Sequence, residues 1–304
     1  MHSREIGMPF GKLVVHSPNP AYLAERVLGQ ASYTRTFAES RYQLYLHREL
    51  PPETEFYRQE MLERGIYLGH HHGVSGRMRL DRDSLSITLG SESQQAYEKI
   101  VWSYALKQIF TCMALRHGAL HLKASMLLKK GKAILLLGRG KSGKTTLASY
   151  LEQTGYYFAG NTHVMVKDHE AWAIPSWRRI RDSAGRESYI LPEHREPANG
   201  TIHAIYVIDC NREGQFACSP LDNRTALSFM TYFAAAAGNY DLKEDLVDYH
   251  RDAGFSERMS LLAAETVLIK HLLRNFKLRY LSADIFDPVC AMKVRDHFHE
   301  GMGL

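Results

Sequence analysis

The middle of the chain alternates short apolar runs with turn residues, and one stretch follows helical spacing. Apolar residues over Leu120–Leu128 and Ala133–Leu137 predict two strands, and the basic turn Lys129–Lys132 between them predicts that they pair as a hairpin. The spacing of apolar residues then predicts a helix over Thr145–Gln153. The second strand is therefore expected to lead through a short loop directly into a helix.

The C-terminal half of the chain contains more short strands and then mostly helices. Further strands are predicted at Tyr156–Ala159, Val164–Val166, Ala171–Ile174, Thr201–Asp209 and Phe276–Leu281. Helices are predicted at Arg224–Ala237, Leu261–Leu273 and Pro288–Phe298. Residues 182–200 are polar and contain Gly and Pro, so we expect a mobile loop there. This order of strands and helices predicts an α/β fold.

The N-terminal part of the chain predicts a separate, smaller α+β lobe. Its predicted elements are strands at Lys12–His16 and Gln43–His47, helices at Pro20–Leu28 and Glu53–Arg64, and a hairpin of Arg77–Asp81 with Ser84–Leu89. A helical pattern over Gln95–His117 follows and ends at Gly118. We therefore predict two domains, residues 1–94 and residues 95–304, with this helix at the boundary.

The composition is that of an ordinary globular protein. The 304 residues are 45% hydrophobic and 23% charged, with a formal net charge of +5. The basic residues are interspersed with acidic ones, which argues against a nucleic-acid partner. No apolar run is long enough for a membrane span, and the N-terminus lacks the apolar segment of a signal peptide. The four cysteines are scattered without a C-x-x-C pair, which favours reduced thiols in a cytoplasmic protein.

The loop between the second strand and the helix carries the strongest chemical signal. The segment Gly138–Thr145 matches the G-x-x-x-x-G-K-[ST] pattern of a P-loop at every fixed position. Its glycines at 138, 140 and 143 can adopt positive φ and let phosphate oxygens approach the backbone. The backbone N–H groups would then form an anion nest at the N-terminus of a helix. The predicted nucleotide-binding residues are Gly138, Arg139, Gly140, Lys141, Ser142, Gly143, Lys144, Thr145 and Thr146.

In this pattern Lys144 reaches the β- and γ-phosphates and the Thr145 hydroxyl ligates Mg²⁺. The sequence therefore predicts a protein that binds ATP or GTP together with Mg²⁺, and it does not choose between the two nucleotides.

The order of these parts resembles the HPr kinase/phosphorylase-like family, whose relatives include kinases that tailor lasso peptides. The residues that carry the resemblance are Arg116–Ser125, which is similar to the family's "G…LH-(A/G)-S" strand, followed by the basic turn, the glycine-rich loop and a downstream strand pair. The resemblance covers roughly residues 95–298 and implies a P-loop domain of the HPr kinase/PEP carboxykinase-like type. It also implies a kinase that phosphorylates a hydroxyl of a peptide or a small metabolite, and it suggests a homo-oligomer.

One departure from the family concerns the site of its acidic pair, which helps to hold Mg²⁺ and supplies the base. This chain has Asn161–Thr162 there, and neither side chain is a base near neutral pH. Another residue can serve as the base, or positioning alone can suffice because the phosphoryl transition state is loose. Alternatively, transfer has been lost and the chain is a nucleotide-binding regulator or partner protein. A simple nucleotide hydrolase is a third hypothesis.

Several side chains are candidates for the remaining chemistry. His121 matches the family's strand histidine and is expected near the γ-phosphate, and His163 follows the altered pair and can replace its base. Asp209 ends an apolar strand as a Walker B acid does, so Mg²⁺ is expected at Thr145, Asn161 and Asp209. Both histidines have the alternative of being ordinary sheet residues, and Asp209 of being a turn residue.

A basic segment supplies a candidate clamp for phosphate or substrate. Arg178, Arg179 and Arg181 are crowded into one short stretch beside tryptophans, and the planar guanidinium suits bidentate phosphate binding. The alternative is a solvated basic edge.

Overall fold

The computed structural model describes residues 1–19, 33, 40–47, 66–67, 75–80, 84–90, 101, 105–174, 178–181, 187–190, 198–210, 213–234 and 253–302. Contacts divide the chain into two compact units. The first contains Met1–Gly118 and Ala235–Thr266, and the second contains Ala119–Ala234 and Val267–Leu304. The predicted domain boundary between residues 94 and 95 stays a prediction.

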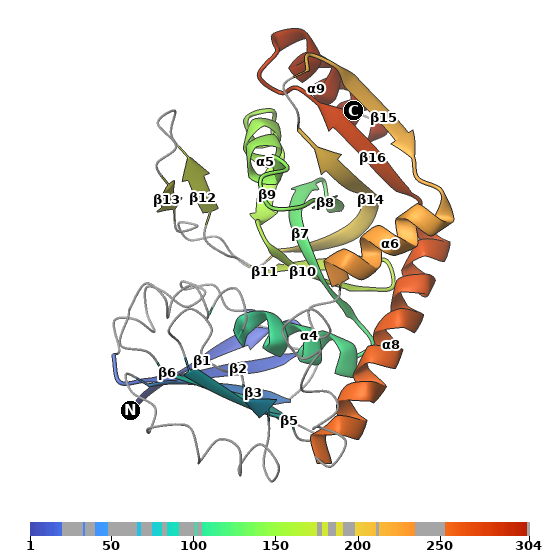
Figure 1. Cartoon of the computed structure of the whole chain (residues 1–304). Coiled ribbons are helices and arrows are strands. Elements are labelled where there is room, and N and C mark those ends of the chain that lie inside the picture. The colour runs from blue at the N-terminus through green and yellow to red at the C-terminus, as the bar shows by residue number, and fades with distance from the viewer. Residues whose placement is uncertain are drawn as a thin grey trace. The chain divides into compact units, whose positions relative to one another are not determined.

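The first unit contains a mixed six-stranded sheet in the order β1-β2-β3-β6-β5-β4. The strands are β1 (His2–Met8), β2 (Gly11–Ser17), β3 (Arg41–His47), β4 (Ile66–Tyr67), β5 (Ser75–Leu80) and β6 (Ser84–Gly90), and the helix α4 (Leu106–Arg116) belongs to the same unit (Figure 1). Leu13 and Val15 of β2 are fully buried while Lys12, Val14 and His16, which alternate with them, are partly exposed, as the pleated strand requires.

The predicted strands of this unit are confirmed, and so is the hairpin, as the antiparallel pair β5–β6. The strand β1 was not predicted, because its first four residues are mostly polar and exposed. The predicted helices Pro20–Leu28 and Glu53–Arg64 lie outside the described residues.

The second unit contains an eight-stranded mixed sheet. Its strands are β7 (Leu120–Lys129), β8 (Lys132–Leu137), β9 (Tyr157–Gly160), β10 (His163–Lys167), β11 (Glu170–Ile174), β14 (Asn199–Asp209), β15 (Phe216–Pro220) and β16 (Leu278–Ala283). The order is β11-β10-β7-β8-β14-β16-β15, with β9 paired to β7. The strands β8, β14 and β16 are parallel to one another, so their carboxyl ends meet at one edge of the sheet.

The predicted hairpin before the glycine-rich loop is the antiparallel pair β7–β8. The first residues of β14 also pair with β11, which links the two ends of the path β11-β10-β7-β8-β14. Besides α4, the described helices are α5 (Lys144–Gln153), α6 (Asn223–Ala234), α8 (Ala253–Asn275) and α9 (Pro288–Gly301). The chain is therefore a mixed α/β protein, as the sequence predicts.

The helices α5 and α9 pack on one face of the second sheet. Their apolar residues form a buried cluster with residues of β7, β8, β14 and β16; it includes Leu147, Leu151, Ile134, Leu136, Tyr206, Leu281, Val294 and Phe298. The hydroxyl of Tyr150 on α5 also donates to the carbonyl of Ala291 on α9 at 2.9 Å. Burial of this face fixes α5, and thus the end of the loop that precedes it, against the sheet.

A two-stranded ribbon of β12 (Arg178–Arg181) and β13 (Glu187–Ile190) follows β11. The predicted mobile loop over residues 182–200 is therefore wrong for β13 and for the start of β14. The strand β15 was also missed, because most of its residues are exposed and it ends in Pro220.

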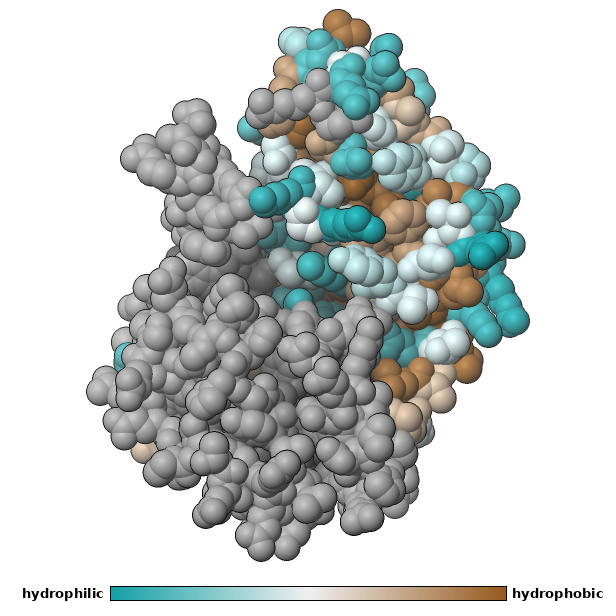
Figure 2. All heavy atoms as spheres, viewed as in Figure 1, coloured by the Kyte–Doolittle hydropathy of each residue, from teal (hydrophilic) through white to brown (hydrophobic). Residues whose placement is uncertain are grey.

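The surface of the second unit mixes hydrophilic and apolar residues on the face that Figure 2 shows. Among its described residues, the most exposed large apolar side chains are Val267, Phe286 and Val289. In the described part of the chain, no helix is both long and apolar enough to cross a membrane.

Candidate functional site

The glycine-rich loop, Gly138–Thr145, connects the carboxyl end of β8 to the N-terminus of α5. Gly143 is in the left-handed region with φ 84°, and a Cβ there would collide with the side chain of Cys210. Gly138 needs its missing side chain for space, since a Cβ would collide with Ser142 Oγ and lie 3.1 Å from the carbonyl oxygen of Ile208. Position 143 therefore requires glycine, whereas a side chain at position 138 would require Ser142 to move.

Of the three glycines expected to serve positive φ, only Gly143 does so: φ is not positive at Gly138 or at Gly140. A Cβ at Gly140 would have nothing within 4 Å. Positive φ occurs instead at Lys141, with φ 69°. Left-handed residues at 141 and 143 give the loop the alternating backbone that forms anion-binding nests. Arg139, Gly140 and Lys141 are exposed, and Thr146 is exposed on the first turn of α5.

The loop is tied to the end of β14. The backbone N–H of Cys210 donates to the carbonyl of Ser142 at 2.9 Å, and the N–H of Ser142 donates to Arg139 at 3.2 Å. Burial, and then the negative charge of Asp209, raise the pKa of the Cys210 thiol to about 12. The thiol is therefore neutral at physiological pH and fills the space beneath Gly143.

Lys144 folds back over its own loop. Its ammonium donates to the carbonyl oxygens of Gly138 at 2.5 Å and of Arg139 at 2.8 Å. An anionic phosphate oxygen is a stronger acceptor for an ammonium than a neutral carbonyl. The positive charge of Lys144 is thus already placed over the loop in which a phosphate would lie.

Thr145 is connected to the segment where the family resemblance places an acidic pair. The Thr145 hydroxyl donates to Asn161 Oδ1 at 2.9 Å. Ser125 Oγ on β7 donates to the backbone carbonyl of Asn161 at 2.7 Å and lies 3.5 Å from its Oδ1. Ser125 is fully buried and Asn161 is 8% exposed. The structure therefore brings together two of the three predicted metal ligands.

The two candidate histidines contact each other. His121 Nε2 on β7 lies 3.0 Å from His163 Nδ1 on β10, and the two rings are stacked with centroids 5.1 Å apart. They are 3% and 1% exposed. One ring nitrogen must donate in this hydrogen bond and the other must accept, so the bond couples the tautomers of the two rings.

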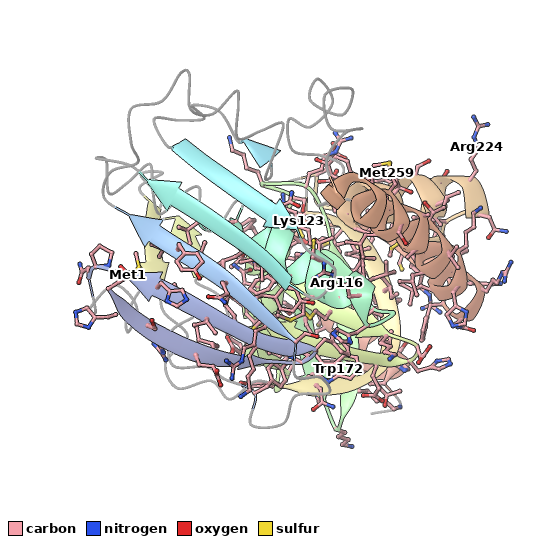
Figure 3. The ribbon with its side chains drawn as sticks, turned by 90° about the horizontal axis from the view of Figure 1, so that it is seen from below. Met1, Arg116, Lys123, Trp172, Arg224 and Met259 are labelled. Atoms are coloured by element: carbon pink, nitrogen blue, oxygen red, sulfur yellow. The ribbon has the colours of Figure 1, made fainter. Side chains whose placement is uncertain are left out.

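The histidine pair lies on the same face of the sheet as Ser125. His121 and Ser125 are four residues apart on β7, and His163 is directly opposite Lys123, which lies between them (Lys123 is labelled in Figure 3). We call His121, Ser125, Asn161 and His163 the strand cluster. The cluster joins the glycine-rich loop through Thr145.

Asp209 lies at the end of the sheet where the glycine-rich loop begins, but its carboxylate points away from the loop. Its strand pairs with β8 up to Leu137 and Val207, so it emerges beside the first residues of the loop. Its carboxylate, however, accepts a long hydrogen bond of 3.4 Å from Tyr280 on β16, the strand on the opposite side of β14. The burial of Tyr280 and the charge of Asp209 together raise the pKa of that phenol.

Arg178, Arg179 and Arg181 lie on β12, and the backbone of β12 approaches α5. The side chains of these arginines lie outside the described part of the structure.

Magnesium would find oxygen ligands at Thr145 and Asn161, which suit a hard cation that keeps several waters. Among the described residues, no three His, Cys, Asp or Glu side chains form a metal-ligand group. A site built from a hydroxyl, an amide oxygen and phosphate oxygens does not need such a group.

Sequence reasoning missed Ser125 as a site residue and missed the role of Cys210. The position of Ser125 four residues after His121 on one strand was the available signal, because that spacing places both on one face. For Cys210, the only signal in the sequence was its position directly after Asp209, the acid at the end of a strand. No family model and no curated protein matches the chain.

Proposed function

We propose that this chain is an ATP- or GTP-dependent kinase of the HPr kinase-like P-loop type, which phosphorylates a hydroxyl of a peptide or a small metabolite. The observation that carries the proposal is the hydrogen bond from Thr145 to Asn161. It joins the phosphate-binding pattern of the loop to the strand pair on which the resembling family places its catalytic acids.

Each residue has a definite role in this proposal. The loop backbone and Lys144 bind the β- and γ-phosphates, and the ammonium leaves the carbonyls of Gly138 and Arg139 to do so. Thr145 and Asn161 would hold Mg²⁺, which would neutralise charge on the phosphate oxygens. Ser125 fixes Asn161 through its backbone carbonyl.

The transfer step breaks the bond between the γ-phosphorus and the oxygen that bridges it to the β-phosphate. A new bond forms between the γ-phosphorus and the acceptor oxygen, and the nucleoside diphosphate leaves. The hydroxyl proton moves to the His121–His163 pair, because Asn161 and Thr162 cannot take it near neutral pH.

The test uses the full chain, Mg²⁺ and γ-labelled ATP with a library of Ser- and Thr-containing peptides and a panel of hydroxylated metabolites. We expect labelled product with at least one acceptor and its loss in Lys144→Ala. We expect His163→Gln to lower the transfer rate at least about 100-fold with a nucleotide Kd near that of the unsubstituted chain. Nucleotide binding without transfer to any probe would contradict the kinase proposal.

The alternative is a nucleotide-binding regulator that has lost transfer. Two observations favour it: the neutral pair Asn161–Thr162, and the burial of both histidines to 3% exposure or less. It predicts nucleotide-dependent binding of a partner and no phosphorylated product. Free phosphate released without an acceptor would instead indicate a hydrolase.

A further inference from the structure

Arg139, the second residue of the glycine-rich loop, lies over an aromatic ring. Its guanidinium carbon is 5.8 Å from the centroid of the Tyr232 ring on α6. This distance is within the range of a cation–π contact. The loop and α6 both belong to the second unit.

Tyr232 is held from one side and open on the other. Its ring packs edge-on against Phe233, with centroids 5.0 Å apart and an interplanar angle of 86°. Phe233 is 3% exposed and stacks on Phe229, whereas Tyr232 is 52% exposed. A ring that is anchored by a buried aromatic neighbour offers a fixed face to a cation.

The contact with Tyr232 holds a second cationic side chain of the glycine-rich loop in place. The carbonyl of Arg139 accepts from the Lys144 ammonium at 2.8 Å, so the backbone of Arg139 lies beside the cation that the P-loop pattern assigns to the β- and γ-phosphates. A guanidinium that contacts a ring through its face keeps its in-plane N–H donors. It can therefore bind a phosphate oxygen without leaving Tyr232.

We propose that Tyr232 is a positioning residue that holds Arg139 ready for the terminal phosphate, and that this pair makes the site prefer a nucleoside triphosphate to a diphosphate. The inference rests on the proposed nucleotide-binding function. Its physical basis is pre-organisation: a guanidinium already held on a ring loses less side-chain freedom when it binds phosphate.

The experiment measures the Kd of a non-hydrolysable ATP analogue and of ADP, both with Mg²⁺, by calorimetry on the full chain. We expect Arg139→Gln to lower the preference for the triphosphate about 10-fold or more, because it removes a charge-assisted hydrogen bond. We expect Tyr232→Leu to lower it about two- to five-fold and Tyr232→Phe, which keeps the ring, to change it less than about two-fold. The double variant Arg139→Gln/Tyr232→Leu should match Arg139→Gln alone, since Tyr232 acts through Arg139.

Tyr157→Leu is the matched control. Tyr157 is also a partly exposed tyrosine, but its strand pairs it with Leu128 near the turn between β7 and β8, at the sheet edge opposite the loop. We expect it to leave the triphosphate preference unchanged. A preference unaltered in Arg139→Gln, or additive losses in the double variant, would overturn the inference. Absence of nucleotide binding by the unsubstituted chain would instead overturn the proposed function.

Discussion

The glycine-rich loop and the strand cluster are neighbours that the chain builds in different ways. The loop is eight consecutive residues, and its strand, turn and helix follow from local spacing and from glycines at 138 and 143. The strand cluster joins residues 36 and 42 positions apart: Ser125 on β7 with Asn161 in the bend between β9 and β10, and His121 on β7 with His163 on β10. Local sequence can specify the first, whereas only the register of the sheet specifies the second. Substitutions should therefore affect the two regions by different physical routes.

The largest effect is expected from Gly143→Ala, which breaks the loop. The new Cβ would have to accept φ 84° and would collide with Cys210. Strain at a left-handed position and the displacement of a packed side chain together predict a loss of about 3 kcal/mol in unfolding free energy. Urea unfolding measures it, and nucleotide binding should be lost as well.

Gly140→Ala is the internal control for this stability measurement. Its φ is not positive and the space is open, so we expect the unfolding free energy to stay equal or to rise by up to about 1 kcal/mol. Equal destabilisation by both substitutions would show that the loop does not have the backbone described here.

The strand cluster is tested by His163→Leu, for which we expect a loss of about 2 kcal/mol. The substitution removes the 3.0 Å hydrogen bond and leaves His121 Nε2 buried without this partner. Removing one ring of the pair leaves the other as a buried polar group without this hydrogen bond, whereas removing both rings does not. The double variant His121→Leu/His163→Leu should therefore lose clearly less unfolding free energy than the sum of the two single variants. Additive losses in urea unfolding would mean that the two rings act separately.

This contrast also explains what the sequence could predict. The α/β class, the β7–β8 hairpin, the loop and α5 were predictable because apolar spacing and glycine positions are local signals. The pairing of His121 with His163 was not, because it depends on β10 aligning His163 with Lys123. The direction of the Asp209 carboxylate depends likewise on Tyr280 in a strand 71 residues away. The strands β1 and β15 were not predicted because many of their residues are exposed, so apolar and polar residues do not alternate clearly along them.

The hydrogen bond between Thr145 and Asn161 is the link between the two regions, and a double-variant cycle measures its strength. We expect Thr145→Ala and Asn161→Ala to show a coupling of about 1 kcal/mol in unfolding free energy. Thr145→Ser, which keeps the hydroxyl, should retain most of that coupling with Asn161→Ala. A coupling near zero would separate the loop from the strand cluster energetically and would remove the main support for a joint site.

The smallest expected effect is a pH dependence of the unfolding free energy, caused by the Cys210 thiol that packs against Gly143 of the loop. Burial, with Asp209 adding to it, raises the thiol's pKa in the folded chain to about 12 from an ordinary value of 9.0, although the Lys144 charge opposes the shift. The unfolded chain therefore releases this proton first, so stability is unaffected below about pH 9 and falls as pH rises from there toward 12. Between pH 7.5 and pH 9.5 the unfolding free energy of the unsubstituted chain should fall by about 1 kcal/mol more than that of Cys210→Ala, whose side chain does not titrate. Parallel pH profiles of the two proteins in urea unfolding would show that the thiol is not buried behind Gly143, and the tie between the loop and β14 would then rest on the backbone hydrogen bond from Cys210 to Ser142 alone.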